Sequence, residues 1–420
     1  MEVSQLDTLQ ELLESALVEK SRKVLIDRAI QIIERKAKKR GVSLTKSQIR
    51  RLRKMWLSGD FSSTTLRFSG KPKSISRSLS FTKKDAQDVE SHSRSLFNKL
   101  DGIIEEVSEP QARIVLSALR KKWPRQRLLD RKHIKGFEQR LAASWKIPIE
   151  LLEMHIRIAF DLGTHFIERH RESPKPRRPL LIDVLARLHA RSCQVAAEIL
   201  TLLKSGFPDG AMARWRTLHE IVVTALFVEK YGEKMARRYL AYDAVESYKG
   251  ATQYQKYCRT LGYEPFSSAE MKTIEIARSE AITQFGAPFG KNYGWAASAF
   301  KKPQHIFAQI EESIGLDHLR PFYKMASQKV HADPKGVLQS LGLTRPDVLL
   351  AGPSNIGLAD PGHSAAISLM QITACLILLQ PTLDHIVMAK VMMTLSDEIG
   401  TAFFKVHKEI ETREEPHGWT

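Results

Sequence analysis

The spacing of apolar residues is the feature that most constrains the fold of this chain. Along almost its whole length, apolar side chains recur every three to four residues, the period of an amphipathic helix. Few segments alternate with the period of two that strands require. The first examples are Leu6, Leu9, Leu12 and Leu13, followed by Val24, Leu25, Ala29, Ile32 and Ile33. We therefore predict an all-α protein, a multi-helix bundle preceded by a basic helical N-terminal region.

The second half of the sequence predicts a series of helices joined mostly by short connections. The predicted ranges are 180–204, 211–230, 233–258, 267–284, 304–314, 318–331, 363–393 and 395–412. Residues 332–362 are rich in Gly and Pro and predict a loop. Short connections make consecutive helices antiparallel neighbours, so we expect one helical bundle here.

Positive charge is distributed very unevenly along the chain. Residues 1–180 contain 39 Lys and Arg against 22 Asp and Glu, a net charge of +17, whereas residues 181–420 contain 26 against 25. The segment HRESPKPRRP, residues 170–179, lies where the charge changes and has the composition of a stiff, solvated linker. We accordingly predict a basic helical region over 1–170, a linker over 171–179 and a helical bundle over 180–412.

A basic region of this size favours a polyanionic partner, and nucleic acid is the commonest one. The densest basic run is 35–56, where Ser43 or Thr45 could cap a helix. A Ser-, Gly- and Lys-rich segment over 58–83 predicts a basic loop. The residues predicted to contact nucleic acid are Arg50, Arg51, Arg53, Lys54, Lys71 and Lys73. A well-solvated basic surface or an anionic membrane surface would also suit this charge.

Several classes of protein are disfavoured by what the sequence contains. The three cysteines, Cys193, Cys258 and Cys375, are far apart, which is typical of a reducing cytoplasm rather than of a disulfide framework. The most apolar stretch, 364–380, is short for a membrane span and contains Ser, Thr and Gln, so we expect a buried helix. The signatures of P-loop, α/β-hydrolase, Rossmann and H-E-x-x-H proteins are missing. We expect a cytoplasmic protein without membrane segment, metal or cofactor.

Two short motifs bring polar residues to one face of a helix. Arg216 and Glu220 are four residues apart and can pair along a helix whose other residues are largely apolar. Tyr323, Ser327 and His331 follow one another at the same spacing, with His331 near the predicted helix end. Histidine transfers protons near neutral pH, so His331 is a candidate general acid or base. Each motif has a plainer interpretation, an ion pair that orients helices and a histidine that fixes a loop.

These motifs resemble those of an uncharacterised bacterial all-helical family, a domain of unknown function, over about residues 180–390. A more distant resemblance is to HEPN ribonucleases, helical proteins of antiphage and toxin systems. Their signature is an arginine followed, after four to six residues, by a histidine. Arg214 and His219 fit that spacing, and Ser327 and His331 resemble the family's site in position, although Ala326 stands where the arginine is expected. The resemblance implies an all-helical fold and metal-independent cleavage of RNA, in an antiphage context.

The leading functional hypothesis is a nucleic-acid-binding protein, for RNA rather than DNA, with a metal-independent ribonuclease site. His331 would transfer protons, Arg214 or Arg216 would stabilise phosphate charge, and Glu220 would orient the arginine. Ser327 and Tyr323 complete the candidate site. Two alternatives stay open, a non-catalytic nucleic-acid-binding or scaffold protein and a regulator that binds a small ligand in the bundle. A homo-oligomer is also compatible with this sequence.

Overall fold

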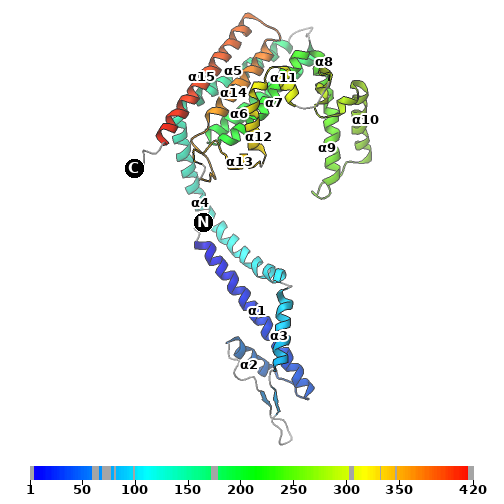
Figure 1. Ribbon diagram of the computed structural model, residues 1–420, viewed down its shortest axis with the longest axis vertical. Helices are drawn as coiled ribbons and strands as arrows, with labels where there is room; N and C mark the ends of the chain where they lie inside the picture. Colours follow the sequence, from blue (N-terminus) through cyan, green and yellow to red (C-terminus); the bar gives the residue numbers. More distant parts are fainter. Residues whose placement is uncertain are drawn as a thin grey trace. The chain divides into compact units, whose positions relative to one another are not determined.

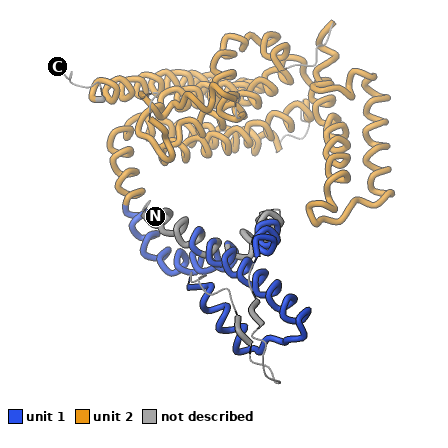
Figure 2. The backbone as a smooth tube through the Cα atoms, turned by 60° about the horizontal axis from the view of Figure 1, so that its bottom comes forward, with its two compact units in different colours: residues 1–132 blue, residues 133–420 orange. Residues whose placement is uncertain are grey.

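The computed structural model describes residues 4–58, 66–68, 77–79, 82–97, 100–171, 178–301, 307–331, 333–345 and 348–414. The chain divides into two compact units, residues 1–132 and residues 133–420 (Figure 2). The all-α class predicted from the apolar spacing is confirmed. Among the described residues, no helix is both long and apolar enough to cross a membrane.

The first unit is built around the long helix α1 (Ser4–Lys39), against which α2 (Lys46–Leu57) and α3 (Lys83–Phe97) pack. Helix α2 begins at a capping box, in which Thr45 and Gln48 satisfy each other's backbone N–H groups, so the predicted cap is at Thr45. The buried side chains of this unit's small core are Ile26, Ile30, Ile33, Ala37, Leu52 and Trp56.

Ion pairs join the three helices around that core. Arg28 of α1 donates to Asp88 of α3 at 2.8 Å, and Arg53 of α2 donates to Asp27 of α1 at 2.8 Å. Each pair is partly exposed, so each stabilises the unit by well under about 1 kcal/mol. Their effect is to fix which faces of the helices meet.

A short hairpin lies within the segment 58–83 that the composition predicted as a loop. Strand β1 (Leu66–Phe68) pairs antiparallel with β2 (Arg77–Leu79), with Arg67 opposite Ser78. The prediction of a loop was therefore wrong for these six residues. Lys71 and Lys73 lie outside the described residues.

Helix α4 (Leu100–Ser144) is a single helix of 45 residues, drawn in cyan in Figure 1. Pro110 and Pro124 both lie inside it. Proline is common in the first turn of a helix, but neither of these prolines begins one. A proline interrupts only one backbone hydrogen bond and can be accommodated within a long helix at the cost of a local bend.

The second unit is a bundle in which α14 (Ala359–Ile377) packs against four other helices. These are α5 (Lys146–Arg171), α6 (Pro179–Lys204), α7 (Pro208–Tyr231) and α15 (Leu383–Glu414) (Figure 1). Because α5 belongs to this bundle, the compact units divide near residue 132, whereas the linker composition had placed the boundary at 171–179.

The apolar helix α14 is held by ring N–H groups from three of its neighbours. Trp215 of α7 donates from Nε1 to the Ser364 carbonyl at 2.9 Å. His155 of α5 contacts the Ala366 carbonyl through Nε2 at 3.0 Å, and since a carbonyl only accepts, this nitrogen carries the proton. His189 of α6 contacts the Thr373 hydroxyl at 3.1 Å. These polar contacts fix the register of a helix whose packing is otherwise apolar.

Helices α5 and α6 approach each other where the ring of His189 lies against Gly163. A Cβ atom on residue 163 would come within 2.4 Å of the His189 ring, which is closer than real Cβ atoms come to other atoms. His189 is buried and bonded to Thr373, so its ring cannot easily move away. Glycine at 163 is therefore required by the close helix packing.

The rest of the second unit consists of shorter helices that follow α7. Helices α8 (Glu233–Ala241), α9 (Asp243–Tyr257) and α10 (Ser268–Phe285) precede the 3-10 turns η1 (Ala287–Gly290) and η2 (Gly294–Ala299). Helix α11 (Phe307–Ser313), the turn η3 (Asp317–Leu319), α12 (Arg320–Val330) and α13 (Pro334–Leu338) come next. The helix predicted over 233–258 is thus divided at Tyr242.

Candidate functional site

The two sequence motifs meet because α12 packs antiparallel on α7. The C-terminal part of α12 is fixed to the start of α7 by Lys329, whose Nζ lies 3.1 Å from Asp209 Oδ1. The Lys329 side chain is only 6% exposed and that of Asp209 is 35% exposed, so the lysine end of this pair is shielded from water. Asp209 also accepts from the Leu341 backbone N–H at 3.0 Å, which ties the loop after α13 to the same point.

Arg216, Glu220 and Tyr323 form a closed hydrogen-bonded triangle between the two helices. Arg216 Nε donates to Glu220 Oε1 at 3.0 Å and to the Tyr323 phenol oxygen at 3.2 Å. The Tyr323 hydroxyl in turn donates to Glu220 Oε1 at 2.6 Å. The guanidinium also lies over the Tyr323 ring, 5.1 Å from its centre. Arg216 is thus held in one orientation by a carboxylate and a phenol from two helices.

The pKa of Tyr323 is shifted by this arrangement. Burial of the phenol raises its pKa, and the hydrogen bond to the Glu220 carboxylate and the charge of that carboxylate raise it further. Tyr323 therefore stays protonated at neutral pH and acts as a hydrogen-bond donor to Glu220.

His331 completes the site at the end of α12. Its backbone N–H donates to the Ser327 carbonyl at 3.1 Å, and its side chain is exposed. Arg216 Nη1 lies 3.3 Å from His331 Nε2. An arginine can only donate, so in this contact Nε2 is the acceptor of a neutral imidazole. A guanidinium that is 24% exposed and a solvent-reached imidazole thus face the same space.

A buried carboxylate connects the helices that hold this exposed site. Glu311 of α11 is fully buried and contacts His219 Nε2 of α7 at 2.8 Å. Its other carboxylate oxygen pairs with Arg320, at the start of α12. The Arg320 guanidinium lies over the Tyr323 ring, 5.3 Å from its centre. Glu311 therefore joins α7, α11 and α12 directly below the Arg216 site.

Tyr293 also lies near the site and has an unusual backbone. Its φ is +53°, in the left-handed region that residues other than glycine rarely occupy. Burial raises the pKa of the Tyr293 phenol, and the nearby charge of Glu220 adds to that effect. A strained residue facing an ionised cluster is more common at functional sites than elsewhere.

Arg214 and Ser327, two of the predicted catalytic residues, do not share the cluster's contacts. Arg214 pairs with Glu198 of α6 and donates to the Thr217 hydroxyl at 3.3 Å. The Ser327 hydroxyl donates to the Tyr323 backbone carbonyl at 2.8 Å, a bond within its own helix. His219, which stands five residues after Arg214, is buried against Glu311. The arginine and histidine that fit the HEPN spacing in sequence therefore have separate partners.

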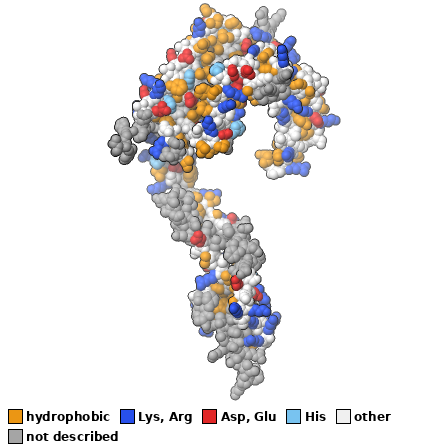
Figure 3. All heavy atoms as spheres, in the orientation of Figure 1, with side chains coloured by type: hydrophobic (Ala, Val, Ile, Leu, Met, Phe, Trp, Pro, Cys, Tyr) orange, Lys and Arg blue, Asp and Glu red, His pale blue; other side chains and the backbone are white. Residues whose placement is uncertain are grey.

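The predicted nucleic-acid contacts of the first unit lie on α2 where the structure describes them. Arg50, Arg51 and Lys54 are exposed, and Arg53 is partly buried by its pair with Asp27. Lys and Arg side chains gather over the part of the molecule that holds α1, α2 and α3 (Figure 3). Residues 1–132 carry 30 Lys and Arg against 16 Asp and Glu, a net charge of +14.

The sequence analysis missed Arg320, Glu311 and Tyr293. Arg320 could have been found, because it stands three residues before Tyr323 and so lies on the same helix face. Glu311 and Tyr293 could not, because only the tertiary packing brings α11 and the η2 turn against α7.

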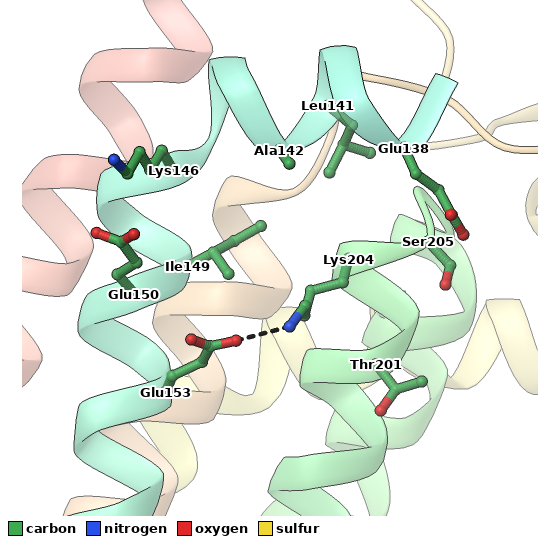
Figure 4. Close-up of a pocket in the computed structure, with 10 residues that line it drawn as sticks. All are labelled: Glu138, Leu141, Ala142, Lys146, Ile149, Glu150, Glu153, Thr201, Lys204 and Ser205. Atoms are coloured by element: carbon green, nitrogen blue, oxygen red, sulfur yellow. Dashed lines mark hydrogen bonds and ion pairs between the residues drawn. The ribbon is translucent and has the colours of Figure 1, made fainter. Parts of the chain in front are cut away.

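A cleft of about 570 Å³ lies elsewhere in the second unit, between the α4–α5 junction and the end of α6 (Figure 4). Lys204 spans it and donates to Glu153 at 2.7 Å, the dashed line in Figure 4. Glu138, Glu150 and Lys146 also line it. Carboxylates outnumber amines on these walls, so the cleft is poorly suited to a polyanion, and it shares no residue with the Arg216 site.

The part of the chain that the structure describes contains no group of three or more His, Cys, Asp or Glu side chains arranged to hold a metal ion. His189 and Cys193, four residues apart on α6, contact each other at 3.9 Å. Burial raises the pKa of the Cys193 thiol to about 12, so this sulfur remains protonated.

Part of the chain matches the model of a protein family. No curated protein matches the chain, and no solved structure does. The segment that matches a family model, residues 182–347, begins in α6 and ends after α13. It contains both motif helices, α7 and α12. It is shorter than the range of 180–390 expected from the motifs. Residues 182–347 match the model of a family described as a family of unknown function, DUF5677.

Proposed function

We propose that this protein binds RNA and cleaves it without a metal ion, at the site formed by Arg216 and His331. The observation that carries the proposal is the 3.3 Å approach of Arg216 Nη1 to His331 Nε2 at a solvent-exposed surface. A fixed cation and a neutral imidazole side by side are what transesterification of a phosphodiester requires.

The chemistry follows from the groups present. When RNA binds, Arg216 Nη1 releases His331 Nε2 and turns to a phosphate oxygen. The freed Nε2 takes the proton from a ribose 2′-hydroxyl, and the 2′-oxygen forms a bond to the adjacent phosphorus. The bond from phosphorus to the 5′-oxygen breaks, and the imidazolium returns the proton to that leaving oxygen. The products are a 2′,3′-cyclic phosphate and a 5′-hydroxyl. RNA supplies its own nucleophile in this reaction.

Arg216 would stabilise the negative charge that develops on the phosphate oxygens. Its Nε is held by Glu220 and Tyr323, while Nη2 carries two further N–H donors. A cation already oriented before the reaction does not need to reorganise during it. Glu220 and Tyr323 act as positioning residues, and the buried Glu311 supports them from below through Arg320.

The test compares His331→Ala with His318→Ala. Both histidines are exposed, and His318 hydrogen-bonds the Gly315 carbonyl of its own turn, at 3.0 Å. Loss of a general acid–base group costs about 10²–10⁴-fold in rate. We expect His331→Ala to lose cleavage of single-stranded RNA to that extent and His318→Ala to retain it. RNA carrying a single 2′-deoxyribose at the cleaved position should resist the wild-type protein.

Other outcomes would support the alternatives raised by the sequence. If purified protein binds RNA but releases no cyclic phosphate, the site is not a nuclease and the protein is a nucleic-acid binder. If Arg216→Lys loses binding of a phosphorylated small molecule while RNA binding is unchanged, the same cluster is a ligand-binding site. Cleavage by His331→Ala at the wild-type rate would exclude the mechanism proposed here.

A further inference from the structure

The middle of α4 is an exposed helical segment without the packing that surrounds the other long helices. Every residue from 116 to 129 is exposed. Three apolar side chains follow one another at helical spacing on one face: Leu116 is 47% exposed, Leu119 40% and Trp123 57%. A Trp of that exposure within an apolar stripe is uncommon on a surface that has no partner.

Arginines line this apolar stripe along one side. Arg113, Arg120 and Arg127 recur every seven residues, and Arg131 stands one turn later. Seven residues are almost two turns, so these side chains fall on one line along the helix. Arg120 is three residues before Trp123 and Arg127 four residues after it, which places a guanidinium on each side of the indole.

We propose that this face of α4, defined by Trp123, Arg120 and Arg127, binds single-stranded RNA by stacking one base on Trp123. The two arginines are separated by about 10.5 Å along the helix axis, and they would meet phosphates on either side of the stacked base. Stacking on an aromatic ring requires an unpaired base, which is why the ligand is single-stranded. The proposal rests on the proposed function and names the surface through which the substrate is held.

Charge decides between RNA and a second copy of the chain as the occupant of this face. Residues 113–132 contain eight Lys and Arg and one acidic residue, Asp130. Two such helices packed side by side would repel each other, whereas a phosphate backbone is attracted and releases its counterions on binding.

The experiment measures the affinity of the full-length protein for a 12-nucleotide oligouridylate by fluorescence anisotropy, between 50 and 300 mM salt. The His331→Ala background prevents cleavage. We expect Trp123→Ala to weaken binding about 5- to 100-fold, the range for one stacked base, and Trp123→Phe to restore most of it. Trp123 is exposed, and alanine favours the helix, so far-ultraviolet circular dichroism should not change.

The arginines are tested against a matched pair on the opposite side of the same helix. The salt dependence is the slope of log Kd against log salt concentration. The double variant Arg120→Ala, Arg127→Ala should lower this slope by about 1.4, because each phosphate contact to a single strand contributes about 0.7 to it. Arg125→Ala with Lys132→Ala removes the same charge at the same spacing, on the side away from Trp123. This control should change affinity less than threefold.

Three results would overturn the inference. Equal weakening by the two pairs would mean that only net charge matters, and no weakening by Trp123→Ala would place the RNA elsewhere. A change from dimer to monomer on Trp123→Ala, seen by sedimentation, would assign the face to self-association. The proposed function is judged separately, because wild-type protein that binds through α4 but yields no cyclic phosphate would leave the surface in place and remove the nuclease.

Discussion

Glu311 is the residue on which the geometry of the candidate site depends most. Its carboxylate is fully buried and contacts both His219 and Arg320, so it links α11 to α7 and α12, the two helices that carry the site. A buried carboxylate is stable only where its partners compensate for lost hydration. Removing its charge should therefore affect stability as well as the orientation of Arg320 and Tyr323.

We expect Glu311→Gln to lower the free energy of unfolding by about 2 kcal/mol. This loss is smaller than the cost of breaking a fully buried ion pair, because the Arg320 side chain is 32% exposed and can be hydrated again. Urea denaturation at pH 7 measures the change. Glu312→Gln is the matched control, since residue 312 is exposed and its replacement should cost less than about 0.5 kcal/mol. Equal effects of the two variants would contradict this role for Glu311.

At the residue scale, the sequence assigned the two distant motifs to one candidate site, and the structure brings Arg216 into contact with both Tyr323 and His331. The pairing of Arg216 with Glu220 follows from their spacing on one helix, and the structure shows it. Arg214 lies apart from that cluster, because its partner, Glu198, is on the preceding helix. Spacing along a helix gives the direction of a side chain relative to its neighbours, but not which other helix that direction faces.

At the scale of elements, α14 depends on two buried histidines that must remain neutral. Burial lowers the pKa of His155 to about 4 and that of His189 to about 4. In the unfolded chain both return to about 6.5. Between these values the unfolded chain binds more protons than the folded one, so protonation favours unfolding.

The stability of the second unit should consequently fall as the pH decreases from 6.5 toward 4. Each histidine contributes up to about 1.4 kcal/mol per pH unit. The raised pKa of the half-buried Asp360 acts in the opposite direction, because that carboxyl gains a proton more easily when folded. Urea midpoints at pH 7 and pH 5 measure the sum. The variant His189→Gln still offers Thr373 a hydrogen bond, and its urea midpoint should differ less between pH 7 and pH 5 than that of the wild type. A difference as large as that of the wild type would refute this explanation.

Helix boundaries were less predictable than the helices themselves. The sequence suggested 363–393 and 395–412, whereas α14 ends at Ile377 and α15 begins at Leu383. Pro381 lies in this connection, and the apolar pattern continues across it, so periodicity alone does not reveal the break. The short helix α13 within the predicted loop is capped by Asp333, whose side chain accepts from the Lys335 N–H at 2.9 Å.

At the scale of the whole molecule, the two units differ strongly in core and in charge. Residues 133–420 contain 35 Lys and Arg against 31 Asp and Glu, a net charge of +4 compared with +14 for residues 1–132. Among the described residues, six buried side chains form the core of the first unit, and the core of the second is many times larger. Small cores are marginally stable, and self-repulsion weakens them further.

We expect the full-length protein to unfold in two thermal transitions, the first belonging to residues 1–132. Salt screens repulsion between exposed charges, so raising it from 50 to 300 mM should move the first midpoint upward and leave the second nearly unchanged. Differential scanning calorimetry measures both. One cooperative transition at all salt concentrations would show that the units do not unfold independently.

The contact between His189 and Gly163 has a consequence for how this sequence can change over evolution. Alanine at 163 would collide with an imidazole that Thr373 holds in place, whereas a smaller residue at 189 would leave a void beside glycine. Neither single step is neutral, so the two positions are coupled. Proteins descended from the same ancestor should therefore either keep both residues or have replaced both, and a set in which position 163 varies freely beside a constant histidine would show that helices α5 and α6 can separate.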